Sequence, residues 1–232
     1  EKPLALHVEE GEDLVETAAR EQRVLMVGHV LQYHPAITRL KAFVDEGELG
    51  DLRYIYSSRL NLGKLRVEEN VLWSFAPHDI SVMLMLLDGC APRDVRAFGG
   101  SYVTKGIYDT TVTELEFEND VKGHIYVSWL HPFKEQKLVV IGSRKMAVFD
   151  DVCDEKLILY PYTIDFTGGT VPVAQRAERT AVGVEEGEPL RKELEHFLGC
   201  VLNRSVPRTD GKEGLKVLRV LDTAQKSLLE RE

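Results

Sequence analysis

Cysteine is scarce in this chain, and its pattern excludes a disulfide-stapled fold. The 232 residues include three cysteines, Cys90, Cys153 and Cys200, which are widely spaced and never form a C-x-x-C pair. This pattern is typical of inert thiols in a reducing compartment, so we expect a cytoplasmic protein. Long apolar runs are also lacking. No stretch approaches the ~18 apolar residues of a membrane span or resembles a secretory signal, so no membrane partner is expected.

Positive charge is in deficit. Lysine and arginine number 29 against 38 aspartate and glutamate residues, which gives a formal net charge of −9. This balance disfavours nucleic acids and anionic lipid surfaces as partners, because both attract basic proteins. A nucleotide-sugar could still bind in a local pocket.

Several catalytic motifs are missing as well. The sequence has no G-x-G-x-x-G dinucleotide loop, no G-x-x-x-x-G-K-[ST] phosphate loop and no G-x-S-x-G nucleophile elbow. His29 and His34 lack the spacing of paired zinc ligands, and no cysteine or carboxylate pattern joins them, so we expect no metal site. The residues alone therefore show no complete nucleotide-binding enzyme.

What is present begins as alternating helix and strand. Apolar spacing predicts a helix over Val8–Gln22. The largely apolar run Arg23–Val27 predicts a strand buried on both faces of a parallel sheet. Three more elements are expected: a helix from Pro35 to Gly47, a strand over Leu52–Leu62, and a helix from Ser74 or Ala76 to Leu87.

From Val95 onward the apolar pattern changes to a period of two. Four strands are predicted, over Thr111–Phe117, Val121–Trp129, Lys137–Ile141 and Lys145–Phe149, with an edge strand over Lys156–Tyr160. A polar loop or arm over Thr167–Gly187 and helices over Glu188–Leu202 and Gly211–Leu229 complete the chain. The pattern predicts an α+β fold with an open, mostly antiparallel sheet and helices on one face. Because apolar residues occur in both strand phases, a homo-oligomer packed through the open face is expected.

Three segments could carry chemistry. Lys2, before Pro3, is held towards an extended backbone and would project from a strand end, although by itself it fits an exposed terminal lysine. Pro77 would place His78 in the first turn of its helix, where the helix dipole favours a neutral, proton-accepting imidazole. The alternative is a histidine without a catalytic role, which only packs or forms hydrogen bonds at a helix start. The third segment, Gly28–Pro35, is a polar and aromatic loop after the apolar strand, which either lines a cleft or only connects two elements.

Taken in order, these segments resemble the glucose–fructose oxidoreductase / inositol dehydrogenase (Gfo/Idh/MocA) family. The resemblance covers nearly the whole chain, and the APHD motif with the preceding RLNLG is most similar to the nucleotide-sugar branch, the UDP-N-acetylglucosamine 3-dehydrogenase-like members. The segments that carry it are Glu1-Lys2-Pro3, VLMVGHVLQYHPA (24–36), GELG (47–50), LWSFAPHDI (72–80), FGGSY (98–102), VSWL (127–130), VIGSRKMAVFDD (140–151) and EPLRKELEHFL (188–198).

The resemblance implies a fold and a chemistry. An N-terminal Rossmann domain would bind NAD or NADP, residues 1–29 would be its last helix and strand, and residues 30–232 would form the substrate-binding and oligomerisation domain. Hydride would pass from a sugar or nucleotide-sugar hydroxyl to the cofactor. Lys2 and His78 would be catalytic, and Glu1 and Lys2 would contact the cofactor. The remaining expected contacts are to the sugar, from Tyr33, Asn61, Trp73 and Ser74; core packing is the alternative for Tyr33 and Trp73.

Two departures from the family pattern leave alternatives open. Many members carry an Asp four residues before the catalytic His, and here that position is Ser74, which has no carboxylate. With the dinucleotide motif absent, we expect this chain to bind no NAD tightly and to be inactive without its Rossmann half. A non-catalytic oligomerisation or binding module derived from the family is the alternative. A truncated chain is a third possibility, in which the strand Arg23–Val27 would lack its neighbours and either pair with another copy in an intermolecular sheet or be poorly ordered.

Overall fold

The computed structural model describes residues 1–166 and 171–230. One sheet of parallel and antiparallel strands dominates its α/β fold. In this part of the chain the sheet has nine strands in the order β2-β3-β4-β1-β5-β6-β7-β8, with β9 also paired to β7. The strands are β1 (Leu52–Leu60), β2 (Pro92–Gly100), β3 (Thr110–Phe117), β4 (Lys122–Ser128), β5 (Glu135–Gly142), β6 (Lys145–Asp150), β7 (Leu157–Asp165), β8 (Val173–Arg176) and β9 (Thr180–Ala181).

The pairing confirms a mostly antiparallel sheet. Neighbouring strands run antiparallel except β1 and β4, which are parallel in the middle of the sheet. Short turns join β3 to β4 and β5 to β6, and antiparallel strands need no more than that. Asp120 takes a left-handed conformation in the first of these turns, with φ of 61°.

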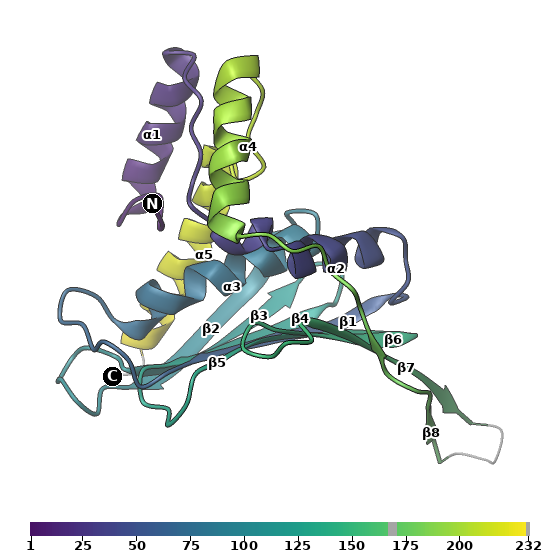
Figure 1. The fold of residues 1–232 in the computed structure, drawn as a ribbon. Coiled ribbons are helices and arrows are strands. Elements are labelled where there is room, and N and C mark those ends of the chain that lie inside the picture. The colour runs from purple at the N-terminus through teal and green to yellow at the C-terminus, as the bar shows by residue number, and fades with distance from the viewer. Residues whose placement is uncertain (167–170, 231–232) are drawn as a thin grey trace.

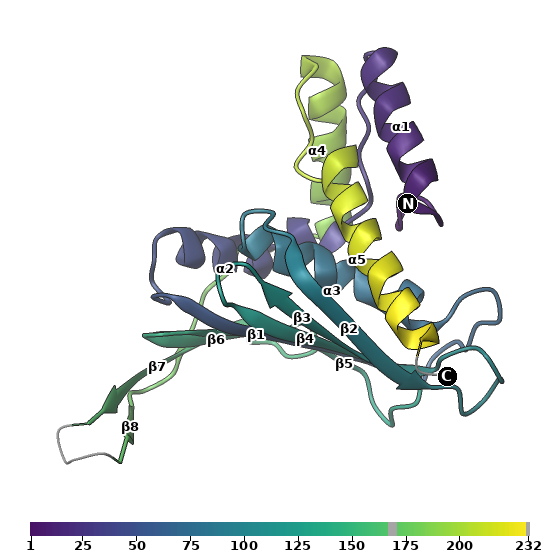
Figure 2. The same ribbon diagram turned by 180° about the vertical axis from the view of Figure 1, so that it is seen from behind.

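Helices cover one face of the sheet, as predicted (Figures 1 and 2). The helical segments are α1 (Val8–Arg20), the 3₁₀ turn η1 (Val30–Tyr33), α2 (Pro35–Asp45), α3 (Val71–Leu86), α4 (Pro189–Asn203) and α5 (Gly211–Leu229). α2, α3 and α5 pack on the sheet. α1 packs against α5 and α4 against η1, and both helices project away from the sheet (Figure 1). Among the described residues, no helix is long and apolar enough to cross a membrane.

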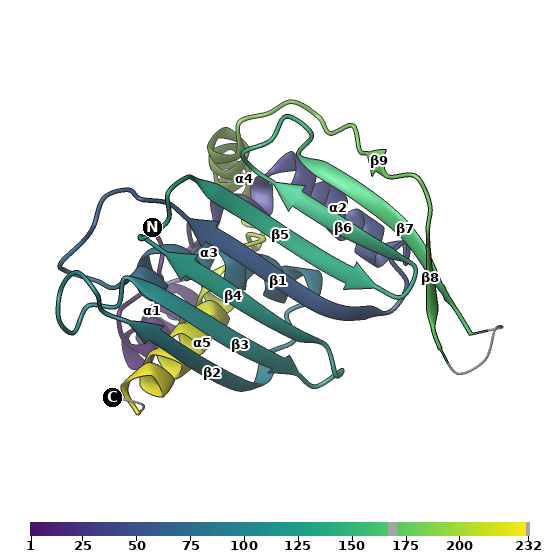
Figure 3. The same cartoon turned by 90° about the horizontal axis from the view of Figure 1, so that it is seen from below.

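The core forms between the sheet and α3. Inward strand positions such as Ile55, Ile125 and Phe117 are fully buried, and they alternate with positions that face the other way. α3 is apolar on nearly all sides, which suits a helix enclosed by sheet and helices. The opposite face of the sheet carries no helix from the described residues (Figure 3).

The predicted buried strand Arg23–Val27 is wrong. The segment is extended, but Arg23 is exposed and Val24, Leu25 and Met26 are half-exposed. Its contacts with a strand-like partner are one bridge between Met26 and Asp210 and the Val27 N–H, which donates to the Thr209 carbonyl at 2.8 Å. A strand buried in a sheet needs hydrogen-bonded partners along both edges. Among the described residues this segment has one short contact on one edge, so it is not a buried sheet strand. Pairing with another copy remains a prediction, as does the division into domains at residue 30.

The sheet is also longer than predicted. β2 was not predicted, and β7 extends five residues beyond the expected end at Tyr160. β8 and β9 lie inside the expected loop Thr167–Gly187, of which residues 167–170 fall outside the described part. β7 and β8 form a hairpin that projects past the rest of the sheet (Figure 1). All four β8 residues are exposed, so hydrophobic periodicity could not reveal them.

Candidate functional site

Lys2 and His78 meet at α3. The Lys2 ammonium donates a hydrogen bond to the backbone carbonyl of Ser74, one helical turn before His78. Burial lowers the pKa of Lys2; Glu69 opposes this shift, while Arg66 and Arg59 reinforce it. The N-terminal lysine is therefore a half-buried cation beside the candidate acid/base histidine.

His78 lies in the interior of α3, and its predicted place in the first turn is wrong. The helix begins at Val71 and is capped by Asn70, whose side-chain oxygen accepts the Trp73 N–H at 3.3 Å. Pro77 thus stands inside the helix, and His78 is beyond the reach of the N-terminal dipole, which fades after the first turn. The helix dipole therefore does not explain a neutral imidazole, because the Asn70 cap starts the helix at Val71, six residues before Pro77.

Burial supplies the neutral imidazole instead. The pKa of His78 is held well below its usual value of 6.5 because the ring is desolvated, and Arg59, Lys2 and His29 lower it further. The ring Nδ1 is fully buried and has no hydrogen-bond partner among the described residues. Nε2 is therefore the nitrogen that a substrate could reach.

A buried ion pair flanks His78. Arg59 on β1 grips Asp79 on α3 through two hydrogen bonds, of 2.8 Å from Nε and 3.2 Å from Nη2. Both residues are less than 10% exposed. The pair ties the helix to the middle of the sheet, and it commits Asp79, so that this carboxylate cannot orient the neighbouring imidazole.

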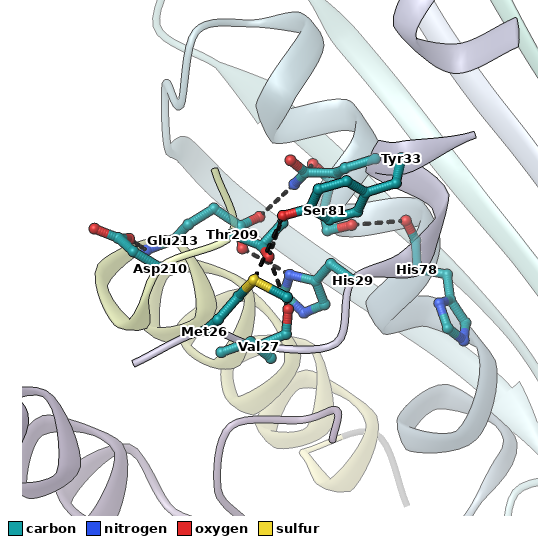
Figure 4. Close-up of polar contacts among 10 residues, drawn as sticks. Met26, Val27, His29, Tyr33, His78, Ser81, Thr209, Asp210 and Glu213 are labelled. Carbon is teal, nitrogen blue, oxygen red and sulfur yellow. Dashed lines mark hydrogen bonds and ion pairs between the residues drawn. The ribbon is translucent and has the colours of Figure 1, made fainter. Parts of the chain in front are cut away.

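A second histidine lies close to the first. His29 follows Gly28 at the end of the extended segment, and its Nδ1 contacts the Glu213 carboxylate of α5 at 2.6 Å. The other oxygen of Glu213 accepts a 2.7 Å hydrogen bond from Gln32, whose amide also reaches the Ser81 carbonyl on α3. Ser81 in turn donates its hydroxyl to the His78 carbonyl at 3.1 Å. Figure 4 shows His29 between Glu213 and His78.

The predicted sugar contacts occupy different places. Ser74 is buried next to Lys2, and its hydroxyl has no partner in the described part of the chain. The Tyr33 phenol instead hydrogen-bonds Thr209 at 3.1 Å, and the Trp73 indole N–H donates to Gln225 at 3.0 Å. Asn61 follows β1 in the loop that leads to Glu69. Tyr33 and Trp73 therefore use their polar atoms inside the protein, while Ser74 retains a free hydroxyl at the site.

Sequence reasoning missed Arg59, Glu213 and the role of His29. A signal for Arg59 existed, since it occupies the same strand phase as the buried residues Ile55 and Ser57. An arginine in the inward phase requires a buried carboxylate. Glu213 stands in the first turn of α5, where the Asp210 side chain accepts its backbone N–H at 2.8 Å. Its carboxylate points to His29, which is 184 positions away in the sequence, and no local pattern encodes such a contact.

The residues fit one part of a dinucleotide site. Lys2, His78 and the buried His29 suit the reacting end of a nicotinamide and its substrate, whereas no glycine-rich phosphate loop is present in the sequence. No group of three or more His, Cys, Asp or Glu side chains in the described residues could hold a metal ion.

The described residues thus form a sheet covered by helices on one face, with the His78 imidazole and the half-buried Lys2 ammonium together at α3. Residues 37–148 match the sequence model of the GFO/IDH/MocA C-terminal domain. The UDP-N-acetylglucosamine 3-dehydrogenase of Acidithiobacillus ferrooxidans is 29% identical over 94% of this chain and 66% of its own length. Its structure superposes with a TM-score of 0.83 at 25% identity, over 98% of this chain and 69% of that one. The D-xylose 1-dehydrogenase [NADP(+)] of Haloarcula marismortui is 22% identical over 93% and 61% of the two chains.

The chain is similar along most of its length to oxidoreductases of the Gfo/Idh/MocA family, and residues 37–148 match the C-terminal domain of that family. It spans about two thirds of the length of these relatives.

Proposed function

We propose that this chain is the substrate-binding and acid/base part of an NAD(P)-dependent dehydrogenase that oxidises a hydroxyl of a sugar or nucleotide sugar. One observation carries the proposal. Lys2, from the N-terminal segment, contacts Ser74 on α3, 72 positions away in the sequence, and it acts electrostatically on His78 of the same helix. The similarity to a nucleotide-sugar dehydrogenase and a xylose dehydrogenase supports the substrate class.

The chain's own residues divide the work. A bound nicotinamide would supply the acceptor for the carbinol hydride. His78 Nε2 takes the hydroxyl proton, because the ring is neutral and its Nδ1 is enclosed. The Lys2 ammonium, held by the Ser74 carbonyl, stabilises negative charge that develops on the same oxygen. The Ser74 hydroxyl contacts the sugar in place of the family carboxylate.

Assembly and location complete the proposal. The free face of the sheet would be covered by a second copy, since it presents a row of aromatic and aliphatic side chains that no described helix covers (Figure 3). The leucines of α4 that are more than half exposed, Leu190, Leu194, Leu198 and Leu202, would pack against a dinucleotide-binding domain. The protein would act in the cytoplasm.

The test is kinetic and uses a form of the protein that includes a dinucleotide-binding domain ahead of Glu1. His78→Ala should lower the turnover of UDP-N-acetylglucosamine oxidation by ~10²–10⁴-fold, because it removes the proton acceptor. The Kd for NAD(P) should change little. His7→Ala, at an exposed site before α1, is the matched control. Equal turnover in the two variants would remove His78 from the mechanism and favour the alternative, a non-catalytic binding module.

A further inference from the structure

His29 is a buried imidazole with one nitrogen committed and the other free. The residue is fully buried, and Nδ1 is engaged by Glu213. Nε2 has no hydrogen-bond partner among residues 1–166 and 171–230. A buried polar atom without a partner destabilises the folded state, which makes this nitrogen a candidate for a functional contact.

Glu213 fixes the tautomer of this ring. Each carboxylate oxygen already accepts one hydrogen bond, from the Gln32 amide and from His29 Nδ1. An ionised carboxylate can only accept, so the proton of a neutral His29 sits on Nδ1, and Nε2 bears the lone pair. A carboxylate that holds an imidazole in this way produces a proton-accepting Nε2, as the aspartate of a serine-protease triad does.

The free nitrogen of His29 belongs to the same polar cluster as His78. His29 acts electrostatically on His78, and Gln32 and Ser81 connect Glu213 to the His78 backbone. Both imidazoles have a buried nitrogen without a partner in the described residues, Nδ1 in His78 and Nε2 in His29. They are not bonded to each other in this conformation, so a proton moving between them needs a water molecule that hydrogen-bonds both.

Beyond Glu213 the cluster reaches solvent. The Glu213 side chain is 19% exposed and lines a cavity of about 210 Å³ together with Gln32, Arg208 and Lys216. The other carboxylate close to His29 is Glu193 of α4, which is buried and whose pKa is raised by desolvation. Glu1 faces Glu193 from the N-terminus. Glu213 is thus the carboxylate that both bonds His29 directly and lines a cavity through which a proton can reach solvent.

We infer that His29 and Glu213 form a proton-release pair for His78, with Glu213 as the positioning residue. This inference rests on the proposed function. The hydroxyl proton passes from the substrate oxygen to His78 Nε2, and the proton on Nδ1 of that ring moves through the bridging water molecule to His29 Nε2. His29 then releases its Nδ1 proton to Glu213 and the outer cavity. One proton is delivered to solvent for each hydride transferred, and both rings are left protonated on Nε2, so each must return to its Nδ1–H tautomer by proton exchange before the next turnover. The pair replaces the carboxylate support that Ser74 cannot give.

Glu213→Gln is the decisive variant, because glutamine keeps the shape but has one acceptor and one donor. Either the Gln32 contact breaks or the amide donates to His29 Nδ1, which moves the ring proton to Nε2. Nitrogen-15 NMR of histidine-labelled chain reads the tautomer without any activity. We expect protonated Nδ1 in the wild type and protonated Nε2 in Glu213→Gln. A wild-type ring protonated on Nε2 would overturn the inference.

The second test measures steady-state kinetics of the protein that includes a dinucleotide-binding domain. Glu213→Gln and His29→Asn should each lower kcat for UDP-N-acetylglucosamine oxidation at least about 10-fold and alter the acid limb of its pH profile. Asp222→Asn is the control, since it makes the same change on the exposed side of α5, where Asp222 pairs with Lys226. Asparagine retains the donor to Glu213, so His29→Asn should fold.

The two failures are distinguishable. Absent wild-type turnover, or turnover unaffected by His78→Ala, refutes the dehydrogenase proposal and the inference with it. Turnover that depends on His78 but is equal in Glu213→Gln and Asp222→Asn refutes the proton-release pair alone.

Discussion

The imidazole of His78 is kept neutral by its surroundings and not by its place in the helix. Arg59 and Lys2 are cations near a desolvated ring, and Asp79, the adjacent carboxylate, is bound to Arg59. A proton on this ring would therefore meet two like charges without a compensating anion in contact. The same arrangement that makes His78 a ready proton acceptor also makes the folded state sensitive to acid.

That sensitivity predicts a pH dependence of stability. The folded-state pKa of His78 lies well below 6.5, whereas in the unfolded chain it returns to that value. As the pH falls below 6.5, the unfolded chain takes up a proton that the folded chain refuses, so the free energy of unfolding decreases. The loss continues until the depressed folded-state pKa is reached, at a rate of up to about 1.4 kcal/mol per pH unit.

His78→Gln should remove this contribution, because glutamine does not titrate. Urea unfolding at about pH 7.5 and about pH 5.5 should show a smaller acid loss for this variant than for the wild type. His7→Gln, at an exposed position, should keep the wild-type dependence. An identical loss in all three proteins would mean that the folded state does not exclude the proton from His78.

Residue-level predictions from the sequence depended on local signals. Lys2 and His78 could be selected because their neighbours Pro3 and Pro77 belong to recognisable motifs, and the structure brings both to α3. The pairs Arg59–Asp79 and His29–Glu213 join residues 20 and 184 positions apart. Burial and charge compensation select such partners only after the chain has folded, so the sequence could show that a partner was needed and not which one it was.

At the scale of elements, α3 shows where competing signals mislead. Proline is favoured in the first turn of a helix, which made Pro77 look like the start. Asn70 is an equally good cap, and the apolar run from Val71 favours the longer helix, because its residues fill the core against the sheet. The other helices were predicted to within a few residues, since their apolar faces repeat at helical spacing without an interior proline.

The cap on α3 should be measurable. Asn70 caps the helix through its oxygen, while its amide donates at 2.8 Å to Gln225, which also accepts from the Trp73 indole. Asn70→Ala removes both contacts and should cost about 1–3 kcal/mol of unfolding free energy. Asn70→Asp keeps the capping oxygen and loses only the donor, so it should cost less than half as much. Equal losses by urea unfolding would show that the cap contributes nothing.

The whole molecule is defined by the unequal faces of its sheet. One face is buried under α2, α3 and α5, and the other is free of described helices (Figures 1 and 3). On the free face, register aligns Tyr56 with Val139, Val139 with Val148, and Val148 with Ile158 across four strands. This apolar row is continuous, with Tyr56, Val148 and Ile158 partly exposed and Val139 buried between them. A contiguous apolar surface is typical of protein interfaces. The two-phase apolar pattern in the sequence led to the same expectation, whereas β8, whose four residues are all exposed, gave no periodic signal.

Self-association through this face gives the last prediction. Val148 lies in the apolar row, and its neighbours Ala147 and Phe149 point into the core, so an arginine at position 148 leaves the folded unit intact. In a face-to-face dimer the same arginine would meet its symmetry mate in a desolvated interface, which costs several kcal/mol. Sedimentation velocity at micromolar concentration should therefore show a dimer or higher species for the wild type and a monomer for Val148→Arg. Leu202→Arg, which alters an equally apolar but separate position on α4, should sediment as the wild type does. A wild-type monomer, or a Val148→Arg variant that still associates, would show that the free face of the sheet is not the interface.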